Sequence, residues 1–249
     1  MSKIYKADLH IHTCLSPCGD LKMSPKNIIE QVLKNNIEII AICDHNSAKN
    51  IPAVIRAAHN KNVCVIPGME ISTIEEVHIL ALFENIEFAN EMEKLVYENL
   101  EGLNDPDLFG MQVIANEFDE VEGFEEKLLI GSVNLSIEQV VDYIHKFNGL
   151  AIASHIDKQH YSIISQLGFI PENLQLDALE ISKNLDQTET KLIMSKYSRF
   201  PFLKNSDAHF IEDLGNVFNE FLIEQPTFEE IKKALQGEAG RKVNIGRVM

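Results

Sequence analysis

The chain has 249 residues, of which 45% are hydrophobic and 24% are charged, so it can form a sizeable core in one large domain or two small ones. Acidic residues outnumber basic residues by 38 to 22, and the formal charge of −16 disfavours tight binding of long nucleic acid. The N-terminus lacks an apolar signal segment, no run approaches the ~18 apolar residues of a membrane span, and the four cysteines do not form a dense disulfide pattern. We therefore expect a cytoplasmic protein with no membrane partner.

Strand and helix patterns alternate over the first third of the chain. The first strand has alternating side chains, which predicts that Asp8, His10 and His12 lie on one face. The next strand is a nearly continuous apolar run, which is typical of a buried parallel strand. In chain order, the predicted elements are a strand at 5–12, a helix from Ser24-Pro25, a strand at 37–43, a helix at 47–60, a strand at 63–66 ended by Pro67-Gly68, and a strand at 77–83.

The alternation breaks at about 84–134, where an acidic helix at 88–100 is followed by several Asn, Asp, Pro and Gly residues. We interpret this segment as an insertion on the rim of a single domain spanning 1–249, because roughly 50 residues is small for an independent core. Residues 111–114 and Asn116 are candidates for a lid, although packing against the side of the domain is the simpler expectation. The later predicted elements are a helix from Ser136 to Phe147, strands at 150–154, 178–181, 202–205 and 217–223, and a helix to about Gln236 that Thr227 and Glu230 begin with a capping box.

Six of the nine histidines lie at or just beyond predicted strands, together with several acidic residues. A His-x-His pair on a strand is by itself also typical of a structural pair. The combination indicates a metal centre, because the ends of barrel strands meet on one face. Imidazoles and carboxylates bind zinc, manganese and iron(II) alike, so the identity of the metal stays open. His59 and His145 lie within predicted helices and are expected to be ordinary surface or packing residues.

Four motifs resemble those of the polymerase and histidinol phosphatase (PHP) superfamily. In the order of that family they are Asp8-Leu9-His10-Ile11-His12-Thr13, Cys43-Asp44-His45-Asn46, Gly68-Met69-Glu70 and Asp207-Ala208-His209. The resemblance implies an α/β fold, a distorted (β/α)7 TIM-like barrel, here with an inserted rim segment. It also implies two or three divalent metal ions at the C-terminal mouth. Cys43 replaces a common threonine and Ile156 replaces a common proline, but neither change removes a ligand.

The resemblance further implies a set of metal ligands distributed over three sites. These are His10, His12, Glu70 and Asp207 for the first metal, Glu70, His78 and His155 for the second, and Asp20, His45 and His209 for the third. Asp8 and Asp44 precede ligands and are expected to orient imidazoles through hydrogen bonds rather than to bind metal.

The predicted chemistry follows from neighbouring metals, which lower the pKa of a bridging water and clamp phosphate oxygens. Hydroxide would then attack phosphorus in line, without a protein nucleophile. Lys158 and His160 follow His155 closely and are the catalytic candidates for holding the phosphate or protonating the leaving group; a solvated loop residue is the alternative for each. A zinc–thiolate site built on Cys14 and Cys18 is disfavoured because Cys-x3-Cys lacks a second ligand pair.

The predicted function is therefore hydrolysis of a small phosphorylated metabolite, a phosphomonoester such as histidinol phosphate or a nucleotide. A nuclease or a nucleotide 3′-phosphatase is the alternative among enzymes. A metal-binding regulatory module without turnover is the alternative of a different class. The rim insertion is expected to govern specificity, and the sequence is also compatible with a homo-oligomer.

Overall fold

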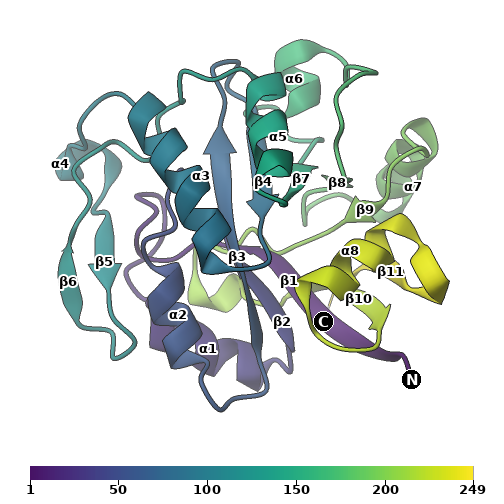
Figure 1. Ribbon diagram of the computed structural model, residues 1–249, viewed down its shortest axis with the longest axis horizontal. Coiled ribbons are helices and arrows are strands. Elements are labelled where there is room, and N and C mark those ends of the chain that lie inside the picture. Colours follow the sequence, from purple (N-terminus) through teal and green to yellow (C-terminus); the bar gives the residue numbers. More distant parts are fainter. Residues whose placement is uncertain (249) are drawn as a thin grey trace.

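The computed structural model describes residues 1–248, and its main feature is a nine-stranded sheet that curls into a nearly closed barrel (Figure 1). The strand order is β11-β10-β1-β2-β3-β4-β7-β8-β9. The strands are β1 (Lys3–Ile11), β2 (Ile39–Ile42), β3 (Cys64–Ser72), β4 (His78–Leu82), β7 (Leu150–Ala153), β8 (Ala178–Glu180), β9 (Phe202–Leu203), β10 (Val217–Ile223) and β11 (Lys242–Val248). This architecture agrees with the predicted TIM-like barrel.

The directions of the strands place the C-terminal ends of the parallel strands at one mouth of the barrel. β1, β2 and β3 are mutually parallel, as are β7, β8 and β9, and β4 runs antiparallel between the two groups. The parallel strands therefore end where β4 begins. The two edge strands, β9 and β11, approach each other. Gly246 in β11 lies so close to Lys204, which directly follows β9, that a Cβ on the glycine would be 2.7 Å from the lysine side chain.

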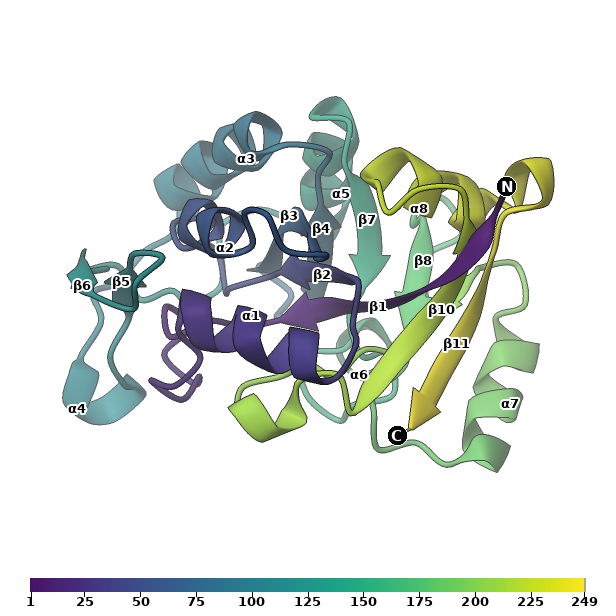
Figure 2. The same cartoon turned by 90° about the horizontal axis from the view of Figure 1, so that it is seen from below.

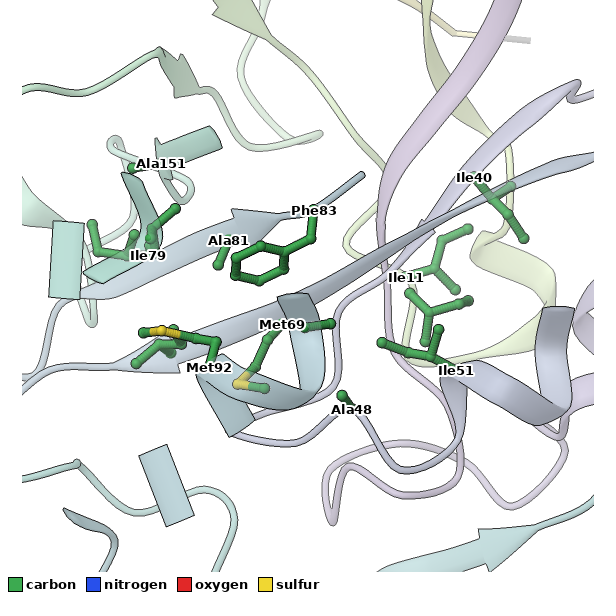
Figure 3. Packing of buried hydrophobic residues seen from close by; sticks show 14 of the residues in the cluster. Ile11, Ile40, Ala48, Ile51, Met69, Ile79, Ala81, Phe83, Met92 and Ala151 are labelled. Carbon is green, nitrogen blue, oxygen red and sulfur yellow. The ribbon is translucent and has the colours of Figure 1, made fainter. Parts of the chain in front are cut away.

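Helices cover the outer face of the sheet, as Figures 1 and 2 show for α1, α2, α3 and α5. Between them and the sheet lies the larger apolar cluster; Figure 3 shows Met69, Ala81, Phe83 and Met92 packed together within it. A second cluster fills the barrel interior and includes residues of α8, which follows β10. The helices are α1 (Pro25–Lys34), α2 (Ile51–Ala57), α3 (Ile86–Asn99), α4 (Pro106–Phe109), α5 (Ile137–Lys146), α6 (Ile163–Leu167), α7 (Gln187–Lys196) and α8 (Phe228–Gln236). Within residues 1–248, none of them has the length and apolar sequence that a membrane span requires.

The 84–134 segment packs along the side of the barrel. It contains α3, α4 and a hairpin of β5 (Val113–Ala115) and β6 (Val121–Phe124), which lies at the opposite end of the molecule from α7 in Figures 1 and 2. The N–H of Val113 donates to the carbonyl of Cys14 at 2.9 Å. The amide of Gln112 is buried and donates to two backbone carbonyls within the segment. The contacts of Gln112 and Val113 therefore favour packing against the side of the domain over a lid.

Three local predictions need correction. β3 does not end at Pro67-Gly68 but continues to Ser72, because the strand changes partner there: Pro67 pairs with β2 and Gly68 pairs with β4. Thr227 caps α8, but the carboxylate of Glu230 accepts from the N–H of Glu224 instead of completing a capping box. The sequence patterns also missed α7 and β11.

The expectation that Asp8 shares a face with His10 and His12 is also wrong. The register of β1 against β2 shifts between Asp8 and Ile11. Leu9 belongs to the interior cluster and Ile11 to the outer cluster, so the shift moves the alternation by one residue. The carboxylate of Asp8 consequently accepts from the backbone N–H groups of Ser206 and Gly215 rather than from a histidine ring.

Candidate metal centre

All predicted metal ligands except Asp20 converge at the mouth of the barrel. They come from the ends of β1, β2, β3, β7 and β9 and from the first residue of β4. Close approaches between their imidazole nitrogens and carboxylate oxygens connect them into one cluster. The converging residues are His10, His12, His45, Glu70, His78, His155, Asp207 and His209.

Glu70 lies at the centre of this cluster and is almost completely buried. Its Oε1 is 3.1 Å from His78 Nδ1 and 3.3 Å from His155 Nε2. Its Oε2 is 3.4 Å from both His12 Nε2 and His45 Nδ1. Several of these atoms have no hydrogen-bond partner among the described residues, namely Glu70 Oε1, His45 Nδ1, and both ring nitrogens of His78. Buried polar atoms are normally paired, so this convergence fits cations held between the side chains.

The cluster contains three sets of donor atoms, and the atoms of each set lie within 4.8 Å of one another. This arrangement fits two or three metal ions. The sets are His10, His12 and Glu70; His45, Glu70 and His78; and His12, His45 and His209. Asp20 belongs to none of them. Its Oδ1 accepts from the N–H of Lys22 at 2.7 Å, while its own N–H donates to the carbonyl of His209 at 2.8 Å. The backbone of Asp20 is thus at the mouth, but its carboxylate closes a local turn.

Protonation differs between the imidazoles of the cluster. Burial opposes a charge on His10 and His12, but neighbouring carboxylates outweigh it and raise the pKa of both rings, so these two must release a proton when a metal binds. Burial is the main reason that the pKa of His45 lies well below its usual value, and nearby imidazoles lower it further. Burial also lowers the pKa of His209 to about 4. Both rings are therefore neutral near pH 7 and have a free lone pair, which a metal ligand requires.

Lys158 and His160 line the pocket above the cluster. The pocket has a volume of about 330 Å³ and is also lined by Ile130, Gln159 and Tyr161. Lys158 Nζ donates to Asp207 Oδ2 at 2.5 Å. Burial opposes its positive charge, but the carboxylate of Asp207 outweighs this and raises the pKa of Lys158. Lys158 is therefore a cation at the site, and the exposed His160 lies at its rim.

Glu180, at the end of β8, is a site residue that the sequence analysis missed. Both of its carboxylate oxygens are 3.0 Å from His10 Nδ1. It also accepts from Asn205 Nδ2 at 2.8 Å and from the N–H of His155 at 3.0 Å. Glu180 thereby directs the Nε2 of His10 into the cluster, as carboxylates behind metal-binding imidazoles do. The available signal was an acidic residue within the apolar 178–181 strand.

The two aspartates expected to orient imidazoles differ in role. Asp44 accepts from Ser16 Oγ at 2.6 Å, and that hydroxyl is 3.0 Å from His12 Nδ1, so Asp44 acts on an imidazole through Ser16. Asp8 instead accepts from the backbone N–H groups of Ser206 and Gly215. It fixes the loop that carries Asp207 rather than a histidine ring.

The structure does not support a zinc–thiolate site. Among residues 1–248, no set of three clustered donor atoms includes a cysteine. Cys14 is buried, its thiol lies 3.7 Å from the carbonyl of Val113, and burial raises its pKa to about 12. His145 is also remote from the cluster, with its ring 2.9 Å from Asp177 Oδ2.

Comparison with known proteins agrees with this geometry. The family model described as PHP domain matches residues 8–163, and the one described as PHP-associated matches residues 195–239. The 5'-3' exoribonuclease Rnm of Salmonella typhimurium is 26% identical over 193 residues, covering 59% of this chain and 64% of that protein. An uncharacterized protein of Methanocaldococcus jannaschii, MJ0417, is 27% identical over 229 residues, covering 89% of this chain and 73% of that protein.

Among solved structures, the lesion-specific endonuclease Q of Pyrococcus furiosus superposes with a TM-score of 0.77 at 21% identity, covering 98% of this chain and 58% of that one. The chain spans between 27% and 64% of the first curated relatives that it matches. Two of these proteins are named as nucleases, which conflicts with the expectation that long nucleic acid is disfavoured. Net charge sums over the whole surface, whereas binding depends on the local field at a site, so the charge of −16 alone does not exclude nucleic acid.

Proposed function

The chain belongs to the PHP domain family, and from this premise we propose that it is a metal-dependent phosphoric ester hydrolase acting on a small phosphorylated molecule. The observation that carries the proposal is the convergence of imidazole and carboxylate donors around Glu70, beneath a pocket that contains the ammonium group of Lys158. We treat the chain as one domain with the 84–134 insertion at its side. A cytoplasmic location is part of the proposal, since all four cysteines are free.

The donor set fits zinc, manganese or iron(II). His10, His12, Glu70 and Asp207 would hold one ion. Glu70 would also contribute to a second ion, together with His78 and His155. A third would rest on His45 and His209. When bound, these metals supply the Lewis acidity that activates water and neutralises phosphate charge.

Side chains of the protein would bind the phosphate, protonate the leaving group and orient a ligand. Lys158 would donate a charge-assisted hydrogen bond to a phosphate oxygen, which holds the ester in place above the cluster. His160, exposed at the rim of the same pocket, would donate a proton to the departing alkoxide. Glu180 keeps the His10 ring in one orientation throughout.

A small substrate is favoured by the size of the pocket. Its volume of about 330 Å³ lies at the lower end of the range of roughly 300–1,000 Å³ for ligand pockets. A nuclease is the second candidate, and the similarity to proteins named as an exoribonuclease and an endonuclease favours it. The end of a nucleic-acid chain would present its terminal nucleotide to the same pocket.

The test is product analysis with protein of measured metal content. Phosphate release from a panel of phosphomonoesters, lost in His10→Ala, is the result that we expect. Release of mononucleotides from an oligonucleotide without free phosphate would establish the nuclease instead. If the metal-loaded protein cleaves neither type of substrate, it is not a hydrolase of phosphoric esters.

A further inference from the structure

Tyr161 lines the pocket but is not one of the proposed metal ligands. Its ring lies flat against the imidazole of His78, with centroids 4.7 Å apart and an interplanar angle of 15°. The residue is nevertheless 44% exposed. One face of the ring is therefore covered by a metal ligand while much of the side chain remains open to the pocket and to solvent.

The backbone holds this ring in place at a conformational cost. Tyr161 has φ +59, in the left-handed region that a bulky side chain rarely adopts. Its carbonyl accepts the N–H of His78 at 2.9 Å, which ties the residue to the start of β4. Burial does not explain why a large aromatic side chain occupies this position, because the core does not enclose it.

Ile130 reaches the same pocket from the end of the 84–134 insertion. Its neighbours are fixed by Asn46, whose amide donates to the carbonyls of Leu129 at 2.8 Å and Gly131 at 2.7 Å. Asn46 directly follows the predicted ligand His45. The position of Ile130 is thus coupled to the metal centre, and it gives the pocket an aliphatic wall besides the aromatic one.

We propose that Tyr161 and Ile130 form the leaving-group subsite of the enzyme and select phosphate esters whose alcohol carries a flat ring, such as a nucleobase. The inference rests on the proposed hydrolase function. The metal ligands and Lys158 account for the phosphate, which leaves the aromatic and aliphatic surfaces for the rest of the substrate. A planar ring gains from stacking on them, whatever its hydrogen-bonding pattern, whereas a polyol gains little.

The competing explanation is that Tyr161 only positions His78. A substrate pair separates the two roles, because 5′-AMP and glycerol 3-phosphate share the phosphate but differ in the ring. Loss of a ring-stacking partner typically weakens binding by roughly 5–150-fold. A positioning role would instead reduce turnover of both substrates equally and lower the metal content.

The experiment compares wild type, Tyr161→Ala, Ile130→Ala and the matched control Tyr161→Phe, each with its metal content measured. We expect Tyr161→Ala to lower kcat/KM for 5′-AMP by roughly 5–150-fold, with glycerol 3-phosphate changed less than about twofold and Tyr161→Phe close to wild type. Ile130→Ala should show the same selectivity to a smaller extent. An equal loss on both substrates, or no loss on either, would overturn the subsite.

Failure of the proposed function gives a different pattern. If metal-loaded wild type hydrolyses neither compound, binding of 5′-AMP is measured by equilibrium dialysis instead. Weaker binding of 5′-AMP to Tyr161→Ala than to wild type, with Tyr161→Phe unchanged, would support the ring subsite without catalysis. Equal binding to all variants would refute it.

Discussion

Replacing Glu180 with glutamine tests whether the residue behind His10 controls metal affinity. The carboxylate accepts from three donors, which are His10 Nδ1, Asn205 Nδ2 and the N–H of His155. Glutamine keeps one oxygen but turns an NH2 group toward at least one of these donors. The substitution also removes the negative charge that polarises the imidazole of His10. Shape is preserved, so the change acts mainly on hydrogen bonding and charge.

The expected loss is about 10–100-fold in metal affinity, the range for residues that orient metal ligands, or about 1.4–2.7 kcal/mol. Glu180→Ala is less informative. It would leave three buried donors unpaired at about 1–3 kcal/mol each, without strict additivity, which is enough to threaten folding.

The assay is competition for zinc or manganese with a chromophoric chelator, alongside thermal unfolding of the metal-free protein to confirm that Glu180→Gln folds. Glu125→Gln is the matched control, because Glu125 is also buried and pairs with Lys49 and Tyr97, neither of which is a proposed metal ligand. It should leave metal affinity unchanged. If Glu180→Gln binds metal within twofold of wild type, the positioning role of Glu180 is refuted.

Three further predictions concern the substrate, the sheet and acid stability. Lys158→Ala should lower kcat/KM for a phosphomonoester by about 10–150-fold, because a charged hydrogen bond worth about 1.5–3 kcal/mol is lost; an unchanged value would remove the residue from the site. Gly68→Ala should lower the free energy of unfolding in urea by about 1–3 kcal/mol, because its Cβ would lie 2.8 Å from the buried Sγ of Cys43. Gly123→Ala should leave this free energy unchanged, because a Cβ there would have no atom within 4 Å. The pKa of Glu230 is lowered from 4.5 to about 2, chiefly by hydrogen bonding to Arg241. The ionised Glu230 therefore stabilises the fold above pH 4.5, and this stabilisation is lost as the pH falls toward 2. Glu230→Gln should be less stable than wild type at pH 7, and the difference should shrink on acidification. A difference in stability that stayed constant as the pH fell would contradict this.

The convergence of eight of the nine proposed metal ligands could be predicted from the resemblance to the PHP motifs, because most of these residues lie at or just beyond the end of a strand. His10 and His12 were expected side by side, and their Nε2 atoms are 3.2 Å apart. Where a prediction depended on strict alternation, it failed. Asp8 was placed with the histidines, but the register shift in β1 turns it toward Ser206, and one extra residue in a strand leaves no local signal.

The supporting residues could not be predicted because their roles depend on contacts between distant segments. Glu180 meets His10 across 170 positions of the chain, and its own strand contains no motif. Ile130 lines the pocket between Leu129 and Gly131, whose carbonyls Asn46 holds. Sequence patterns identified the insertion by the break in alternation, but which of its residues faces the pocket is decided by tertiary hydrogen bonds.

Backbone conformation at the mouth links the site to the residue that we propose for specificity. Several non-glycine residues there have positive φ, a state that costs about 1–3 kcal/mol each. They are Asn46 at +50, His155 at +27, Tyr161 at +59 and Asp207 at +47. Asn, Asp and His adopt this region more readily than other residues, so three of these positions combine the required side chain with a tolerable backbone. Tyr161 is the exception. Its ring is not among the proposed metal ligands and the core does not enclose it, which is why we propose that it contributes to substrate binding.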